Sequence, residues 1–182
     1  LSLGPAVSPL PQDQALVTQV RTVLAATPLP QRIYSRLKRQ GVGEDIPAFT
    51  IAKEAGLNAP LVFMRRSGQP LTKGVPGLFT YAGYHRGFQR EVGNVADQLA
   101  DEESWVLGIA GGSRAQALRD PTAGGRLLDD VRRLYLADYA KTWDAFIDDI
   151  KLLPATDMSK TIQMSKVLSA PDNPLRPLMV GL

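Results

Sequence analysis

Apolar residues spaced three and four positions apart run from Arg126 to Leu153, and this pattern constrains the fold more than any other feature of the chain. Side chains at this spacing lie on one face of an α-helix. The pattern therefore predicts a single helix of about seven turns. Asp129 and Asp130 near its start and Lys151 near its end complement the helix dipole, and Pro154 ends it. Because so long an apolar face needs other helices to cover it, we expect a helical bundle.

A second informative stretch runs from Val75 to Phe88, where a glycine-rich loop leads into a helix crowded with aromatic side chains. The hydroxyl of Thr80 is expected to cap this helix by accepting a backbone N–H of its first turn. Aromatic residues recur here and along the long helix at helical spacing, which is typical of core positions. We expect the following core anchors: Tyr84, Phe88, Trp105, Tyr135, Tyr139, Trp143 and Phe146.

Proline and glycine divide the chain into four predicted parts. Residues 1–12 hold three prolines and form an extended lead-in, and residues 13–59 form a small helical subdomain. Residues 60–79 hold a β-hairpin, with a strand at 61–64 that returns through 70–72, and a loop. Residues 80–182 form the main helical domain. The predicted fold class is mainly α, a helical bundle in two parts with one small β-hairpin.

Composition excludes several classes of protein. The 182 residues include no cysteine, which excludes disulfides and thiolate metal sites. No apolar run approaches the roughly 20 residues that cross a bilayer. The chain begins with Leu1 and shows no signal segment, so we interpret it as a soluble piece of a longer protein.

Catalytic chemistry has few candidate residues. His85 is the only histidine, so a Ser-His-Asp triad would have to use it and a multi-histidine metal site is excluded. Asp148 and Asp149 are adjacent carboxylates, but neighbouring residues on a helix point about 100° apart and do not converge on one site. We therefore expect no catalytic, cofactor-binding or metal-binding residue. A hydrolase that relies on His85 or on paired acids is an alternative interpretation of these residues.

Charge is unevenly distributed along the chain, whose net charge is +3. Residues 1–90 carry 11 Lys and Arg against 4 Asp and Glu, whereas residues 91–182 carry 10 against 14. A basic half can meet nucleic acid or an acidic surface, or it can face the other half or a neighbouring protein. Arg65 and Arg66 are expected to be exposed at the hairpin tip and are the candidates for contact with an acidic partner. The alternative for them is a solvated turn.

Three motifs, taken in their order along the chain, resemble the periplasmic region of the IcmF/TssM family, the inner-membrane core component of bacterial type VI secretion systems. The resemblance covers roughly residues 31–182, and its specificity comes from the ordered set. The nucleotide-binding loop, the transmembrane helices and the β-rich end of the family's members are absent from this sequence. The motifs are Pro76–Thr80 with Gly83, Tyr84 and Phe88, then Glu103–Gly108, then Val131–Tyr139 followed by Trp143.

The resemblance implies a structural, non-enzymatic periplasmic segment of the TssJ-TssL-TssM type of membrane complex. Such a segment links the inner and outer membranes and docks partner subunits. The implied partners are the outer-membrane lipoprotein TssJ, the inner-membrane protein TssL and further copies of the protein itself. No nucleic acid and no cofactor are implied, and the full-length protein is expected to be anchored in the inner membrane. The alternative is a basic binding module for a polyanionic partner.

Overall fold

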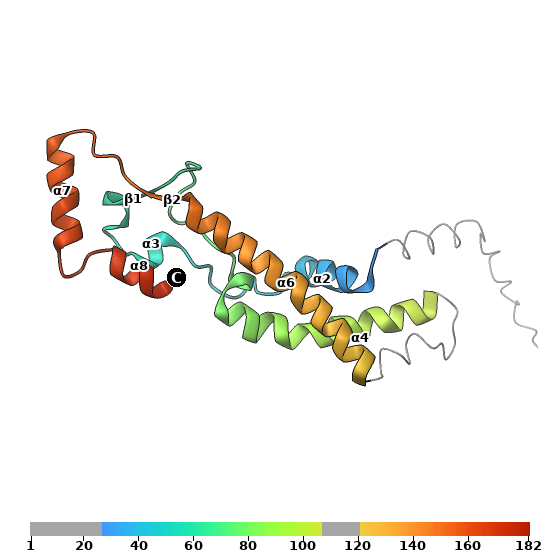
Figure 1. Ribbon diagram of the computed structural model, residues 1–182. Coiled ribbons are helices and arrows are strands. Elements are labelled where there is room, and N and C mark those ends of the chain that lie inside the picture. The colour runs from blue at the N-terminus through green and yellow to red at the C-terminus, as the bar shows by residue number, and fades with distance from the viewer. Residues whose placement is uncertain (1–26, 107–120) are drawn as a thin grey trace, which may run out of the picture.

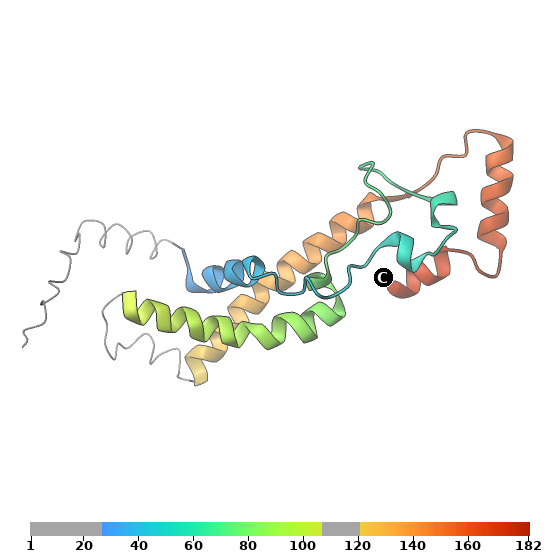
Figure 2. The ribbon, with the colours of Figure 1, turned by 180° about the vertical axis from the view of Figure 1, so that it is seen from behind.

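The computed structural model describes residues 27–106 and 121–182, with side chains at 27–99 and 124–182. Within these ranges the chain is mainly helical and has one small two-stranded antiparallel sheet, which confirms the predicted mainly α class. Figures 1 and 2 show an elongated body, with helices α2, α4 and the first half of α6 at one end and α7 and α8 at the other. Predictions for residues 1–26 lie outside the described residues.

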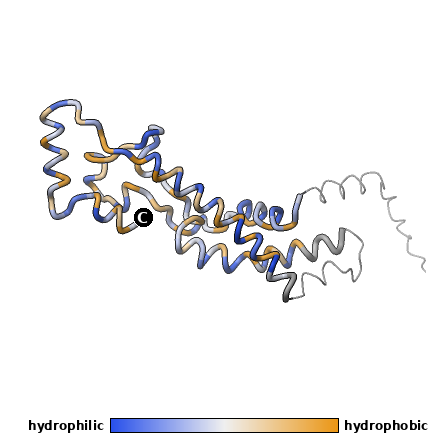
Figure 3. The backbone as a smooth tube through the Cα atoms, viewed as in Figure 1, coloured by the Kyte–Doolittle hydropathy of each residue, from blue (hydrophilic) through white to orange (hydrophobic). Residues whose placement is uncertain are grey.

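Helix α6 (Pro121–Asp149) forms the axis of this body. Its 29 residues span about 44 Å. Figure 3 shows hydrophobic and hydrophilic residues alternating along it, as expected for a helix with one covered face. The long helix is confirmed, but its predicted end at Leu153 is wrong, because Ile150–Leu152 form strand β2. Apolar spacing alone does not separate a last helical turn from a short strand.

A bundle of helices forms one end of the body. Helices α2 (Leu29–Arg39) and α4 (Gln89–Val106) both contact α6. Gly41, with φ 70°, follows the end of α2, where a left-handed residue commonly ends a helix. The bundle encloses a cluster of buried side chains that we call the bundle core: Ile33, Tyr34, Leu37, Phe88, Val92, Val95, Val131 and Tyr135.

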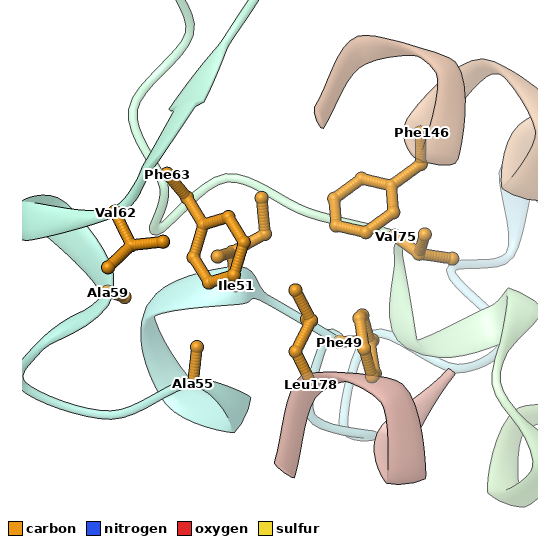
Figure 4. Close-up of a cluster of buried hydrophobic side chains, with 9 residues drawn as sticks. All are labelled: Phe49, Ile51, Ala55, Ala59, Val62, Phe63, Val75, Phe146 and Leu178. Carbon is orange, nitrogen blue, oxygen red and sulfur yellow. The ribbon is translucent and has the colours of Figure 1, made fainter. Parts of the chain in front are cut away.

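Short elements pack around the other end of α6, as Figure 4 shows. They are α3 (Ile51–Glu54), the 3₁₀ turn η1 (Ala59–Leu61) and α8 (Leu175–Gly181). Helix α7 (Met158–Ser169) adds partly buried side chains to the same end. The carboxylate of Asp157 accepts the N–H of Lys160 at 2.8 Å and so caps the start of α7. The buried side chains of this end, which we call the distal core, are Phe49, Ile51, Ala55, Ala59, Val62, Phe63, Val75, Phe146 and Leu178.

The sheet joins two segments that lie far apart in the sequence. Strand β1 (Phe63–Arg65) pairs antiparallel with β2 (Ile150–Leu152), and Met64 lies opposite Lys151. The predicted return strand at 70–72 is therefore wrong. Pro70 has no N–H to donate to a ladder, and residues 68–74 are loop and turn. The pairing instead holds the loop after β1 against the end of α6.

The two cores do not follow the order of the chain. Residues of α2 pack with α4 and α6, whereas residues 49–63 pack with the end of α6 and with α8. Helix α6 contributes Val131 and Tyr135 to the bundle core and Phe146 to the distal core. It is thus shared by both, and the domain boundaries at 12, 59 and 79 stay predictions. Over the described ranges, the structure contains no helix with the length and apolar character of a membrane span.

Candidate functional site

The candidate site lies where α6 meets the 3₁₀ turn η2 (Gly77–Phe79) between the two cores. The buried hydroxyl of Tyr135 donates a hydrogen bond of 2.7 Å to the carbonyl of Leu78. The indole Nε1–H of Trp143 donates one of 2.7 Å to the carbonyl of Phe79. Because the two donors lie about two helical turns apart, the turn is fastened to α6 at two points. We call η2 together with Tyr135 and Trp143 the joint.

Glycine allows the backbone to approach itself closely at the joint. A Cβ atom on Gly83 would overlap the carbonyl oxygens of Gly77 and Leu78. A Cβ atom on Gly77 would overlap the carbonyl oxygen of Ile46. Backbone atoms cannot move aside as the end of a flexible side chain can, so both positions require glycine.

Thr80 holds the helix that leaves the joint. Its hydroxyl accepts the N–H of Gly83 at 3.1 Å and donates to the carbonyl of Gly77 at 2.7 Å, which confirms the predicted cap. The sequence predicts a helix that begins at Thr80, but Gly83–Phe88 form the π-helical segment η3 before α4 begins. A π turn closes hydrogen bonds from i to i+5 and often marks a functional region.

A chain of aromatic contacts runs along α6 from one core to the other. Phe88 stacks on Tyr135 with 4.3 Å between ring centroids, and Tyr135 lies 6.1 Å from Tyr139. Tyr139 lies 6.1 Å from Trp143, which reaches Phe49 of the distal core at 4.9 Å. Pairs at these separations are favourable beyond the apolar area that they bury. The ring contacts therefore form a continuous path of side chains between the two cores.

Six of the seven predicted core anchors lie in the two cores or pack against them. Trp105 falls in the last turns of α4, where side chains lie outside the described residues. Three are buried: Phe88, Tyr135 and Phe146. Three others are partly buried and pack against the same cores: Tyr84, Tyr139 and Trp143.

Asp138 ties α6 to α2. Its carboxylate accepts hydrogen bonds from the hydroxyl of Tyr34 at 2.8 Å and from the ammonium of Lys38 at 3.0 Å. Burial favours a raised pKa for Asp138, but the bonds from Lys38 and Tyr34 outweigh it and hold that pKa below its usual range. Burial, followed by the bond to Asp138, raises the pKa of Tyr34. Sequence reasoning missed the contacts of Asp138 with Tyr34 and Lys38, although Asp138 lies inside the third motif.

Asp149, the last residue of α6, is held by the loop after β1. Its Oδ2 accepts hydrogen bonds of 2.6 Å from the hydroxyl of Ser67 and from Nε of Arg65. Its Oδ1 accepts the N–H of Ser67 at 2.6 Å. The Ser67 hydroxyl, then the Ser67 N–H and the Arg65 guanidinium, lower the pKa of Asp149 to about 2. This carboxylate therefore serves as a clamp between the loop and the helix.

Arg65 is not the exposed tip residue that the sequence predicts. Besides its ion pair with Asp149, it donates to the carbonyl of Lys73 at 2.6 Å and lies 4.7 Å from the centre of the Phe146 ring. Only 10% of its side chain is exposed. The cause is the pairing of β1 with β2, which turns Arg65 toward the end of α6. Arg66 is exposed, and its N–H donates to the carbonyl of Asp149 at 2.7 Å.

His85 lies on the exposed side of the π-helical segment. Its Nδ1 is 2.9 Å from Oε1 of Gln89, and its ring centroid is 4.3 Å from that of Tyr81. In the described part of the chain, no three His, Cys, Asp or Glu side chains gather as the ligands of a metal would. The joint therefore provides no reactive group; it provides two hydrogen bonds that hold the backbone of η2 to α6 between the cores.

Comparison with known proteins gives the family. The family described as "IcmF-related: Intracellular multiplication and human macrophage-killing" matches residues 2–182. "Type VI secretion system component TssM1" of Pseudomonas aeruginosa is 41% identical over 167 residues. That match covers 92% of this chain and 14% of the relative, so the chain spans a small part of the curated relative's length. No solved structure matches. On both matches, the chain belongs to the IcmF/TssM family.

Proposed function

We propose that this chain is a structural, non-enzymatic segment of a type VI secretion membrane complex, which lies in the periplasm and acts as a strut between partner subunits. The family assignment supports the type of complex. The observation that carries the role of a strut is the pair of hydrogen bonds from Tyr135 and Trp143 to the carbonyls of Leu78 and Phe79.

A strut must keep its two ends in a fixed relation. Here α6 spans about 44 Å and supplies buried side chains to both cores. Where the cores meet, the backbone of η2 is held by two side-chain donors on the helix. Bending the body at this point would leave two carbonyls without their partners, and an unpaired buried polar group is unfavourable. The joint therefore resists hinging.

The first and third motifs of the family meet at the same place. Leu78 and Phe79 belong to the first motif, Tyr135 belongs to the third, and Trp143 follows it. Residues of two of the three motifs are thus bonded to each other between the two cores. This coincidence supports a family role that depends on shape.

The carboxylates of α6 suit structure better than proton transfer. A general acid or base works best when its pKa lies near the operating pH. Asp149 has a pKa of about 2, and Asp138 is occupied by Tyr34 and Lys38. His85 is paired with Gln89 on the surface. These environments support a non-enzymatic role.

Co-purification tests the proposed partners, which are the outer-membrane lipoprotein TssJ, the inner-membrane protein TssL and further copies of the protein. Tagged full-length protein isolated from detergent-solubilised envelopes should recover TssJ and TssL. The double variant Tyr135→Phe/Trp143→Phe, which keeps the rings but removes both donors, should recover less of each. Tyr81→Phe, at an exposed position, is the matched control. Recovery of neither subunit by the wild-type protein would refute the proposal.

Thiol labelling tests the location in the periplasm. The chain has no cysteine, and Leu57 is 99% exposed, so Leu57→Cys introduces one accessible thiol into this segment. In full-length protein whose other cysteines are replaced, a maleimide that crosses the outer but not the inner membrane should label this thiol in intact cells. Labelling that requires lysis of the inner membrane would place the segment in the cytoplasm.

A further inference from the structure

Helix α8 is apolar on almost every side. Of its seven residues, only Arg176 has a polar side chain. A helix that is apolar all round is typical of a protein interior. In the described structure, however, Leu178 is the one residue of this helix that is buried, where it packs in the distal core. Helix α8 therefore has the composition of a helix that is covered on more sides than the described residues cover it.

The uncovered side of α8 forms one continuous stripe. Leu175, Met179 and Leu182 follow one another at spacings of four and three, so they share one face of the helix. These residues are 37%, 66% and 43% exposed, and the neighbouring Val180 is 82% exposed. The N–H of Leu182 donates to the carbonyl of Leu178 at 3.1 Å, so Leu182 continues the helical geometry. We call Leu175, Met179, Val180 and Leu182 the α8 face.

Helix α7 adds to the uncovered apolar surface at this end of the body (Figure 1). Three of its side chains pack partly against the distal core, but none of its residues is fully buried in the described structure. Met158 and Ile162, one turn apart, are 74% and 48% exposed. Of the twelve large apolar side chains that are exposed in the described residues, six thus lie within residues 158–182. A concentration of exposed apolar side chains marks a contact surface.

The position of Leu182 indicates what covers the α8 face. Leu182 belongs to the face, so residues that follow it in the full-length protein begin at this surface. The match to the curated relative covers 14% of that protein, so most of a family member lies outside this segment. A segment joined directly to a surface has an effective concentration on the order of millimolar there, which favours it over a separate partner.

The chemistry of the α8 face favours a permanent contact. Surfaces that bind separate partners reversibly are about as polar as the rest of a protein surface, whereas permanently covered surfaces are more apolar. The four side chains of the α8 face carry no charge and no hydrogen-bonding group. They therefore offer a separate partner neither electrostatic steering nor polar specificity.

We propose that, in the full-length protein, the α8 face packs against an apolar side of the segment that follows Leu182. Helix α8 is then an interior helix of a larger folded unit. The joint fixes the bundle core to the distal core, and the α8 face passes this fixed relation on to the next part of the protein. The contact lies within one polypeptide, so it does not depend on the proposed partner subunits.

Thiol labelling of the full-length protein tests the contact. Val180→Cys is placed in protein whose other cysteines are replaced, with one copy in each lipid nanodisc, so that neither detergent nor a second copy covers the face. Maleimide labelling should be at least about tenfold slower in the folded protein than in urea, as for a side chain that is exposed only by local opening. Tyr81→Cys, at a position 79% exposed in this structure, should label nearly as fast as in urea. Equally fast labelling of both thiols in the folded protein would overturn the inference.

Truncation identifies what covers the face. In a protein that ends at Leu182 and keeps everything before it, Val180→Cys should label about as fast as Tyr81→Cys. Val62→Cys, in the distal core, should label slowly in both proteins, which shows that this core stays folded. If Val180→Cys stays slow in the truncated protein, lipid or an earlier part of the chain covers the face and the inference is wrong.

A point variant tests the contact without truncation. Met179→Asp places a charge where the side chain is 66% exposed in this structure, so it is unfavourable only if the face is covered. In the full-length protein it should speed labelling of Val180→Cys at least about fivefold, because an unpaired buried charge is unfavourable. Leu136→Asp, at a 47% exposed position of α6, is the control and should leave this labelling unchanged. Equal labelling with the two variants would contradict the contact. Recovery of secretion subunits is a separate measurement, whose failure would remove the proposed function but not this contact.

Discussion

Trp143 donates its indole N–H to the carbonyl of Phe79 at 2.7 Å while its ring lies 4.9 Å from the ring of Phe49. One side chain therefore satisfies a backbone carbonyl at the joint and also packs against the distal core. Tryptophan suits this position because it combines a large apolar body with a single donor. The relationship explains how packing in one core becomes linked to backbone position between the cores.

Removal of the indole N–H of Trp143 alone should lower the free energy of unfolding by a measurable amount. Trp143→Phe keeps an aromatic ring but leaves the Phe79 carbonyl without its partner, so the free energy of unfolding should fall by about 1–2 kcal/mol. Trp143→Ala also removes the ring contacts and should lower it by about 3 kcal/mol. Urea unfolding followed by circular dichroism measures both values. Arg133→Ala, at an exposed position of α6, should change stability by less than about 0.5 kcal/mol. Equal losses for Trp143→Phe and Arg133→Ala would show that the indole bond does not stabilise the fold.

The Tyr135 bond should contribute independently. Tyr135 is fully buried, so Tyr135→Phe leaves the Leu78 carbonyl unpaired and should lower the free energy of unfolding by about 1–2 kcal/mol. Tyr81→Phe makes the same chemical change where the ring is 79% exposed and should shift stability by less than about 0.5 kcal/mol. Thermal melts of the two variants give the comparison. A melting temperature of Tyr135→Phe that equals that of Tyr81→Phe is incompatible with the joint.

Replacement of two glycines in the same helical region by alanine should change the free energy of unfolding in opposite directions. Gly83→Ala forces a Cβ into the carbonyls of Gly77 and Leu78 and should destabilise the fold by more than about 2 kcal/mol. Gly93 has open space around its Cβ position, so Gly93→Ala should stabilise α4 by about 0.5–1 kcal/mol. Urea unfolding measures both changes, because the midpoint falls for a destabilising substitution and rises for a stabilising one. A neutral Gly83→Ala variant would show that the backbone is not tightly packed there.

The sequence predicted elements whose signals are local. The long helix, the cap at Thr80 and the helical fold class follow from spacing and capping chemistry, which depend on neighbouring residues. The partner of β1 lies more than eighty positions away, and no local signal connects residues 63–65 to residues 150–152. The prediction that Arg65 is exposed was wrong for the same reason: the local hairpin that would have placed it at a tip does not form.

The joint was beyond sequence reasoning because its acceptors are backbone carbonyls. The carbonyls of Leu78 and Phe79 have no signature in side-chain chemistry, although their donors Tyr135 and Trp143 stood among the predicted anchors. The ordered motifs gave the family but not the contact between them. The physical link between the first and third motifs became visible only in three dimensions.

Stability should depend on pH through Asp149. Its pKa is about 2 in the folded chain and about 3.9 in an unfolded one. Because the folded value is lower, this carboxylate stabilises the fold fully above about pH 5, and the contribution is lost as pH falls through 4 toward 2. Asp149→Asn should lower the urea midpoint at pH 7 and reduce its fall between pH 5 and pH 3. The exposed neighbour variant Asp148→Asn is the control, and a pH profile of Asp149→Asn that parallels the wild type would contradict the clamp.

Native-state hydrogen exchange of the Tyr135→Phe/Trp143→Phe double variant tests the central claim most directly, namely that the joint makes the two cores one mechanical unit. Amides of α2 report on the bundle core, and amides of α8 report on the distal core. If the joint couples them, the free energy of opening should fall by a similar amount in both helices, because they open in one cooperative step. A loss of protection confined to one helix, with the other unchanged from the wild type, would show two independent bodies and contradict the account.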